Sequence, residues 1–359
     1  MDMTKPISVE IKVCDLLDIL KKCDGFAATR DLIPVMQHLG FCGGRVLATD
    51  GVVGISVKLP RSYPNMTLPA DGFVKLLATF DDEMKLQLSI SLQDSGGVVT
   101  CRVADYSAIF HSYSIDEFPI IHIPSAAIKL PASEFEAITR LRFVAVDKGS
   151  KPELAGVWFD ADGWGVTTDG IRLAWRRPVK GGLRNLFVPV YLLERVVGWE
   201  ESPSQYVDDK NGRFWFLYPN CAVFAVKPSA SFPDVRGILT AGIEACKKAH
   251  GFIGDREHLN VVVRRLLLMA QDVNAKLELS VEKSLLILRV PATAQYRDTA
   301  VERVAVKTHT GGTVSSMCVN GRLLLDAVER FEEFFLIEQG LVAFSDERTY
   351  GHIIARLVN

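Results

Sequence analysis

The chain has 359 residues, which at ~100–200 residues per domain corresponds to two or three domains. Its 41 lysines and arginines nearly balance its 43 aspartates and glutamates, and 48% of its residues are hydrophobic. These values exclude a disordered chain and a uniformly basic nucleic-acid binder, and 27 glycines with 16 prolines exclude a collagen-like chain.

The N-terminal segment MDMTKPISVEIKV lacks the basic-then-apolar pattern of a signal peptide. No stretch approaches the ~20 uninterrupted apolar residues of a membrane-spanning helix, so we expect no membrane association. The seven cysteines are odd in number and form no CxxC pair, so neither a zinc site nor a disulfide framework is predicted. We therefore expect reduced thiols and a cytoplasmic protein.

The first segment of the chain alternates between strand and helix patterns. Residues 7–13 alternate polar and apolar side chains, which predicts a strand. Residues 14–23 space three leucines at helical intervals and end in Lys21 and Lys22, where the helix dipole favours cations. In chain order we then expect strands around 41–47 and 52–59 joined by an Asp50-Gly51 turn, a helix at 73–80, and a meander of strands at 84–92, 98–104 and 108–115.

Features of this segment recur further along the chain. Strand, Thr-Asp-Gly and strand follow one another around Asp50 and again around Asp169, 119 residues later. A proline precedes an apolar helix at Pro69 and at Pro189, 120 residues later, and Asn320 holds this position in a third copy. The repeats predict three tandem α+β units of about 120 residues, each with two helices on one face of an antiparallel sheet. The later helices are expected at 134–143, 191–199, 258–271 and 323–331.

No catalytic motif is found. The chain contains no phosphate-binding GxxxxGK[ST] loop, no GxGxxG, no GxSxG and no HExxH, and its seven histidines lack metal-ligand spacing. We therefore predict no enzyme activity, no cofactor and no metal site. Asp50 and Asp169 leave a nuclease-like alternative open, because paired carboxylates can hold a divalent cation. The structural interpretation is favoured, since Asp-Gly is typical of tight hairpin turns.

Basic residues gather on the predicted helices. They lie at the end of the first helix of each unit and within the second helices of the first two units: Lys21, Lys22, Lys75, Arg140, Arg142, Arg195, Arg264 and Arg265. Solvated helix faces would explain this pattern. Alternatively, the helices together present a positive lining that attracts phosphates without reading bases.

Several segments resemble one protein family over the whole chain. TTDGIRLA at 167–174, SFPDVRGIL at 231–239 and YGHIIARL at 350–357 resemble the bacterial-type DNA sliding clamp, the β subunit of the replicative DNA polymerase. ATRDLIPVM at 28–36 and LPADGFVKLL at 68–77 resemble its first domain. Elsewhere the sequence diverges, as expected for a phage- or mobile-element-encoded member.

The resemblance implies three clamp domains, at 1–123, 124–245 and 246–359. Such chains form head-to-tail homodimers, so this chain would be half of a six-domain ring around double-stranded DNA. The ring would act as a processivity factor: it would tether the replicative DNA polymerase and be loaded by a clamp loader. An inert structural protein with the same fold is the remaining alternative.

The resemblance also implies three sets of site residues. A peptide-binding cleft would contain Leu154, Thr168, Gly170, Ile171, Arg172, Leu173, Pro233, Arg236, Gly237, Ile238, Gly351, Ile353 and Ala355. Arg30 would join the basic residues named above as a DNA contact, and Ala108 and Phe110 would meet Leu268 and Met269 of the partner chain. Several cleft residues would equally suit a plain hydrophobic core. Gly237, Ile171 and Ile353 depart from the family's usual Arg, His and Met, which leaves the partner motif open.

Overall fold

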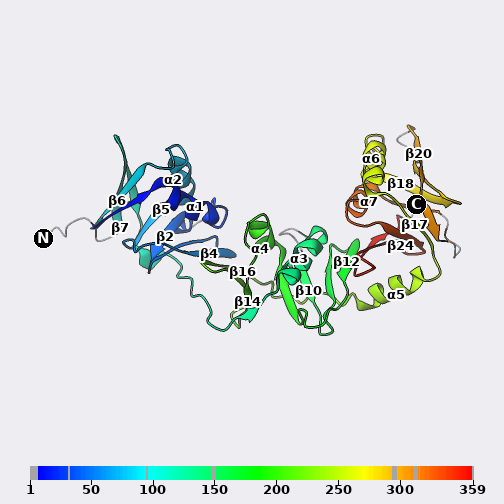
Figure 1. The fold of residues 1–359 in the computed structure, drawn as a ribbon, viewed down its shortest axis with the longest axis horizontal. Coiled ribbons are helices and arrows are strands. Elements are labelled where there is room, and N and C mark those ends of the chain that lie inside the picture. The colour runs from blue at the N-terminus through cyan, green and yellow to red at the C-terminus, as the bar shows by residue number, and fades with distance from the viewer. Residues whose placement is uncertain are drawn as a thin grey trace. The chain divides into compact units, whose positions relative to one another are not determined.

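The computed structural model describes residues 7–30, 33–93, 96–146, 151–292, 297–309, 314 and 316–357 (Figure 1). The chain forms two compact units, Met1–Glu136 with Tyr191–Ser229 and Ala137–Val190 with Ala230–Asn359. It passes from one unit to the other three times: within α3 (Ala132–Leu141), at the beginning of α4 (Val190–Val196) and between Ser229 and Ala230. The predicted α+β class is confirmed, with antiparallel sheets and α-helices in each unit. No helix in the described ranges is long and apolar enough to span a membrane.

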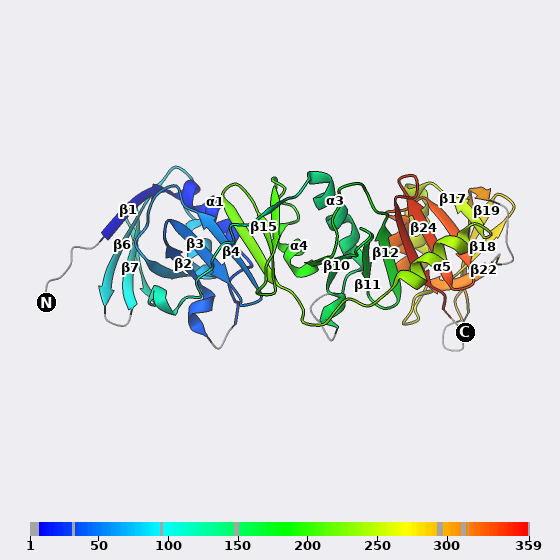
Figure 2. The same ribbon diagram turned by 90° about the horizontal axis from the view of Figure 1, so that it is seen from below.

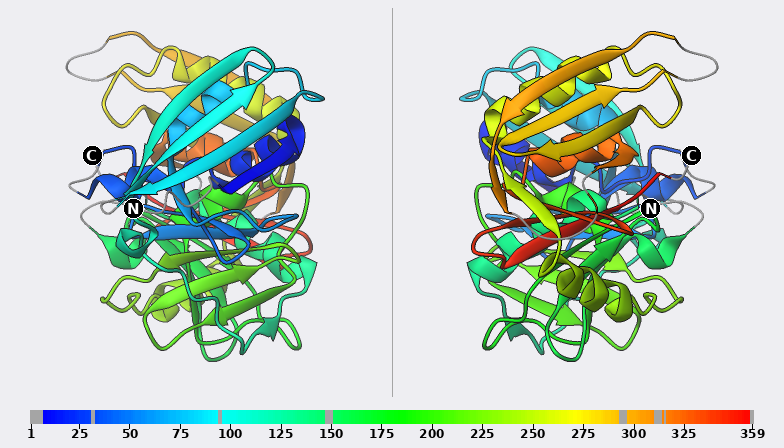
Figure 3. Two further views of the ribbon diagram at one scale, coloured as in Figure 1. Left: turned by 90° about the vertical axis from the view of Figure 1, so that its left-hand side faces the viewer. Right: turned by 90° about the vertical axis from the view of Figure 1, so that its right-hand side faces the viewer.

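The first unit contains a four-stranded and an eight-stranded sheet (Figures 2 and 3, left). The smaller sheet has the order β1 (Ile7–Lys12), β6 (Lys85–Gln93), β7 (Gly96–Val103), β8 (Tyr106–Ser112). The larger has the order β5 (Met66–Pro69), β2 (His38–Cys42), β3 (Arg45–Thr49), β4 (Val53–Lys58), β16 (Cys221–Val226), β15 (Arg213–Leu217), β14 (Gln205–Asp208), β9 (Ile128–Lys129). Helices α1 (Val13–Cys23) and α2 (Ala70–Leu77) pack against each other, and α1 buries its leucines as their spacing predicts. Short 3-10 turns occupy Pro34–Gln37 and Ile115–Glu117.

The second unit contains a nine-stranded and a four-stranded sheet (Figure 3, right). The larger has the order β13 (Leu186–Pro189), β10 (Gly156–Phe159), β11 (Gly165–Thr168), β12 (Arg172–Arg176), β25 (Tyr350–Ala355), β24 (Gly340–Ser345), β23 (Glu333–Ile337), β17 (His250–Ile253), β21 (Lys307–His309). The smaller has the order β20 (Ala300–Ala305), β19 (Leu285–Val290), β18 (Lys276–Glu282), β22 (Ser316–Asn320). Its helices are α5 (Arg236–Cys246), α6 (Arg256–Leu267) and α7 (Gly321–Val328), with 3-10 turns at Arg142–Val144 and Pro152–Leu154.

The strand order follows one rule. Three sets of four strands end in β4, β12 and β20. Two further sets of four end in β16 and β8, and one set of five ends in β25. β4 pairs with β16, with Val53 opposite Ala225, and β12 pairs with β25, with Leu173 opposite Ile353. Both larger sheets are therefore joined by the same antiparallel contact, which leaves β20 and β8 as outer strands. This order supports three repeated units, whose boundaries at 123/124 and 245/246 stay a prediction.

The six predicted helices are confirmed within a few residues at each end, and two local expectations are wrong. Residues 41–47 were expected to form one strand, but Gly43 and Gly44 have φ values of +57° and +71° and turn the chain between β2 and β3. Two successive residues with positive φ fit a two-residue hairpin. Helix α5 is absent from the predicted elements, because residues 231–239 were interpreted only through their family resemblance.

Helix α5 covers one face of the nine-stranded sheet (Figure 2). Its Leu239 joins a buried cluster that includes Leu173, Trp175 and Ile353. Across the β12–β25 pair, Trp175 lies so close to Gly351 that a Cβ atom there would be 2.1 Å from the indole ring. Gly351 is therefore required by the tryptophan that packs over it.

We expect Gly351→Ala to lower the free energy of unfolding by roughly 1–3 kcal/mol, because the added methyl group overpacks the core against Trp175. Chemical denaturation measures the change. Gly237→Ala is the matched control, since no atom lies within 4 Å of an added Cβ there. Equal stability of the two variants would contradict the packing argument.

Candidate functional site

The two Thr-Asp-Gly sequences form the same hairpin turn. The Asp169 carboxylate accepts bonds from the backbone N–H groups of Ile171 and Arg172, both at 2.9 Å, and Gly170 has a φ of +90°. The Asp50 carboxylate accepts hydrogen bonds from the backbone N–H groups of Val52 and Val53, at 2.8 and 2.7 Å, and Gly51 has a φ of +86°. The predicted turn role of both aspartates is therefore confirmed.

The turn contacts bear on the nuclease-like alternative. One Asp169 oxygen binds backbone N–H groups, and the other accepts from Arg172 Nε at 2.9 Å. In the described part of the chain, no group of three or more His, Cys, Asp or Glu side chains is arranged to hold a metal ion. The geometry of these aspartates is explained by the fold alone.

The expected peptide cleft divides into buried and exposed residues. Leu154, Leu173 and Ile353 are buried, and the last two lie beneath α5. Ile171 and Ile238 are each 61% exposed. Four other residues of the expected cleft are exposed, namely Gly170, Pro233, Gly237 and Ala355. Thr168 and Gly351 are buried. The structure brings Ala355 to Ile171, whose carbonyl accepts the Ala355 N–H at 3.3 Å. Of the large apolar residues in this set, Ile171 and Ile238 are therefore the ones available to a partner.

Arg236 anchors the beginning of α5. Its guanidinium lies 3.0 Å from the Asp160 carboxylate, also pairs with Asp162, and is 5.4 Å from the centre of the Trp164 ring. These residues belong to the turn between β10 and β11. The contacts fix α5 against the strands that it covers.

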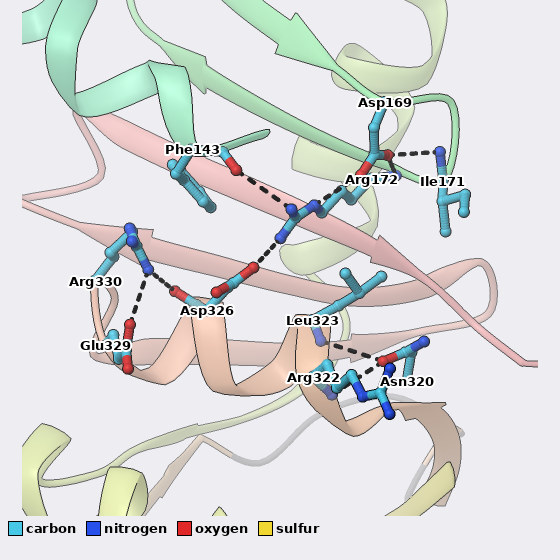
Figure 4. Close-up of polar contacts among 10 residues, drawn as sticks. All are labelled: Phe143, Asp169, Ile171, Arg172, Asn320, Arg322, Leu323, Asp326, Glu329 and Arg330. Carbon is cyan, nitrogen blue, oxygen red and sulfur yellow. Dashed lines mark hydrogen bonds and ion pairs between the residues drawn. The ribbon is translucent and has the colours of Figure 1, made fainter. Parts of the chain in front are cut away.

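Arg172 lies at the centre of a polar network (Figure 4). Its side chain is only 11% exposed, pairs with Asp169 and with Asp326 of α7, and donates to the Phe143 carbonyl at 3.3 Å. Arg330 donates to the Asp326 carbonyl at 2.8 Å and lies 4.5 Å from the centre of the Phe143 ring. All three nitrogen atoms of the Arg172 guanidinium are thus engaged within the fold. Its role as a clamp for peptide carbonyls stays a prediction.

His352 is buried beside this network without a hydrogen-bond partner in the described residues. Its ring stacks on Phe331 at 5.5 Å between centres and meets the Phe143 ring edge-on at 5.2 Å. Burial, reinforced by the positive charges of Arg172 and Arg330, lowers the pKa of His352 well below its usual value. Sequence reasoning missed this residue, because a lone histidine in an apolar strand carries no motif.

The expected DNA contacts differ in their charge partners. Five of them pair with carboxylates: Lys21 with Asp18, Lys75 with Asp71, Arg140 with Asp346, Arg264 with Glu329 and Arg265 with Glu302. Arg142 donates to the Thr139 carbonyl at 2.8 Å. Lys22, Arg30 and Arg195 are exposed. The structure thus brings several predicted cations to the helix surfaces, most of them already neutralised.

The expected dimer residues lie on outer elements. β8 is an outer strand of its sheet. On β8, the Phe110 ring meets the Phe73 ring edge-on, with 5.6 Å between the ring centres, and Ala108 is half-buried. Ile109, between them, is 66% exposed. Leu268 and Met269 are exposed at the end of α6. Ile109 was missed by sequence reasoning, although alternation along an edge strand places it on the opposite face from Ala108 and Phe110.

We compared the chain with known protein families, curated sequences and solved structures. No family model matches the chain, and no curated protein matches its sequence. Among solved structures, the DnaN sliding clamp (DNA polymerase III subunit beta) of Pseudomonas aeruginosa bound to griselimycin is similar, with a TM-score of 0.84 and 16% identity over 99% of this chain and 100% of that one. The β sliding clamp of C. crescentus has a TM-score of 0.83 and 18% identity, covering 99% of each chain.

The β subunit of Thermotoga maritima DNA polymerase III is also similar, with a TM-score of 0.80 and 16% identity over 98% of this chain and 99% of that one. The similarity extends over the whole chain in each of these comparisons. The chain therefore has the fold of the bacterial β sliding clamps, as its sequence segments indicated, at low sequence identity.

Acid should destabilise this protein partly through His352. Its pKa is lowered in the folded state, so protonation favours the unfolded chain, and stability falls as pH drops below the unfolded value of about 6.5. The destabilisation from this residue should grow as the pH falls from 6.5 towards 5. Denaturant unfolding of His352→Phe should therefore show a shallower pH dependence than the parent.

Some dependence should persist in that variant, since burial also lowers the pKa of His38, to about 4. The exposed His122 provides the control variant His122→Gln. An unchanged pH dependence in His352→Phe would show that the buried ring does not govern acid sensitivity.

Proposed function

We propose that this protein is a DNA polymerase processivity factor, a homodimeric ring that encircles double-stranded DNA and slides along it. The observation that carries the proposal is the match to the bacterial sliding clamp fold over 98–99% of the chain. Fold alone does not define function, so the proposal also draws on the edge strands and the basic helices. The three domains would be 1–123, 124–245 and 246–359, and the ring would work in the cytoplasm.

The strand order supports head-to-tail assembly. β4 pairs with β16 and β12 pairs with β25, and the third pair of equivalent strands is β20 and β8. An outer strand exposes unpaired N–H and C=O groups that another strand can satisfy. Pairing of β20 with β8 of a second copy repeats the internal contact, and two such contacts close a ring.

DNA would be held by topology and not by sequence readout. Exposed basic residues on helices attract phosphates without distinguishing bases, which permits sliding. A clamp loader would open the ring, and the replicative DNA polymerase would be tethered to it. No catalytic step is required of the ring itself.

Partners would dock a short peptide on the apolar surface of the cleft. Ile171 and Ile238 supply exposed apolar side chains, and such clefts bind peptides through a few apolar anchors. Leu173 and Ile353 support this surface from beneath, because they are covered by α5.

Retention on closed circular DNA tests the ring. The parent protein should sediment as a dimer of twice 39.7 kDa and, once loaded, stay on nicked circular DNA until the circle is cut. Ile109→Asp should yield a monomer that is not retained, because a charge on outer strand β8 disrupts pairing with β20. Ile7→Asp is the matched control, since Ile7 is 55% exposed on β1, the opposite edge of the same sheet.

A parent protein that remains monomeric and never increases polymerase processivity on primed circles would favour an inert structural protein. Magnesium-dependent cleavage of the DNA, abolished by Asp169→Ala, would favour the nuclease-like alternative. Both outcomes would refute the proposed function.

Substitution of an exposed cleft residue tests partner binding. Ile238→Ser should weaken binding of a polymerase-derived peptide at least tenfold while leaving the unfolding midpoint unchanged, because Ile238 contributes little to the core. Fluorescence anisotropy with a labelled peptide measures the affinity. Thr240→Ala, another exposed α5 position, is the control, and parent-like affinity of Ile238→Ser would remove this residue from the cleft.

A further inference from the structure

The basic residues that the proposed ring presents to DNA differ in whether a carboxylate already pairs with them. Arg264 and Arg265 of α6 each pair with a carboxylate, Glu329 and Glu302 respectively, whose side chains are only 28% and 26% exposed. These half-buried carboxylates are held by the surrounding structure and stay beside the arginines. A DNA phosphate that approaches either arginine must therefore compete with a carboxylate already in place.

Lys22 and Arg195 are in a different situation. Neither has an ion-pair partner among the residues that the structure describes, and both side chains are exposed. Their charges are therefore balanced by mobile ions from solution. When a phosphate replaces those ions, they are released, which favours binding at low salt.

Gly25 brings Arg195 to the end of α1. The guanidinium of Arg195, from α4, lies so near Gly25 that a Cβ atom there would be 2.5 Å from Nη1. Gly25 also has a φ of +75°, which side chains rarely adopt. Lys22 precedes Gly25 by three residues, a span of at most about 11 Å. Both residues thus belong to the region around the end of α1, where Asp24 is also exposed.

We infer that Lys22 and Arg195, together with the equally exposed Arg30, form the main phosphate contact of this protein, and that Arg264 and Arg265 contribute little. The inference rests on the proposed function, because it ranks contacts within the proposed DNA-binding surface. By this inference, most of the electrostatic attraction between the protein and the DNA phosphates comes from the first unit. The carboxylates of Glu302 and Glu329 weaken the contribution of the α6 arginines.

The salt dependence of DNA binding tests this assignment. Binding of the full-length protein to a short linear duplex is measured by anisotropy between 50 and 200 mM salt. Lys22→Gln with Arg195→Gln should reduce the slope of log affinity against log salt by about 1.8, so that affinity falls about tenfold less over this range. Arg264→Gln with Arg265→Gln removes the same formal charge and should leave the slope nearly unchanged.

A third double variant tests the masking by carboxylates. Glu302→Gln with Glu329→Gln frees both α6 arginines and should steepen the slope by up to about 1.8. Sedimentation confirms that each variant keeps the parent's assembly. Equal slope losses in the two cation variants would overturn the inference and leave the clamp function intact. A parent that binds no duplex at any salt concentration would instead overturn the proposed function.

Discussion

The pairing of outer strands between repeated units is the constraint on which this structure depends. Each of these sets of strands would expose unpaired backbone groups at its last strand, and β4–β16 and β12–β25 satisfy those groups by forming continuous antiparallel sheets. The same contact is used twice inside the chain and is available once more at β20 and β8. One local rule therefore accounts for the joined sheets and for the head-to-tail assembly that we propose.

A second set of contacts supports the joint between β12 and β25. Arg172 begins β12, and its guanidinium connects the turn before that strand to α7 through Asp326. Phe143 and His352 fill the space beside it without offering the histidine a hydrogen bond. A cationic histidine would be disfavoured between Arg172 and Arg330, so this joint depends on a neutral ring.

Charge partners divide the basic helices into two classes. The formal charge of −2 is compatible with DNA binding, because positive residues need only a local surface. The α6 arginines pair with Glu302 of β20 and with Glu329, which directly follows α7. Among the described residues, Lys22 at the end of α1 and Arg195 of α4 have no ion-pair partner. The distribution of carboxylates, more than the number of lysines and arginines, thus determines where phosphates are attracted.

The sequence by itself determined the periodic and local features of this protein. Leucine spacing predicted α1, Asp50-Gly51 and Asp169-Gly170 predicted two hairpin turns, and the repeated order predicted the α+β class. These features depend on neighbouring residues, whose intervals are visible in the chain. Only the tertiary structure decided that α5 covers Leu173, that Trp175 requires Gly351, and that Glu302 neutralises Arg265. Such contacts join residues from separate elements, so they depend on how strands and helices pack, which no local pattern specifies.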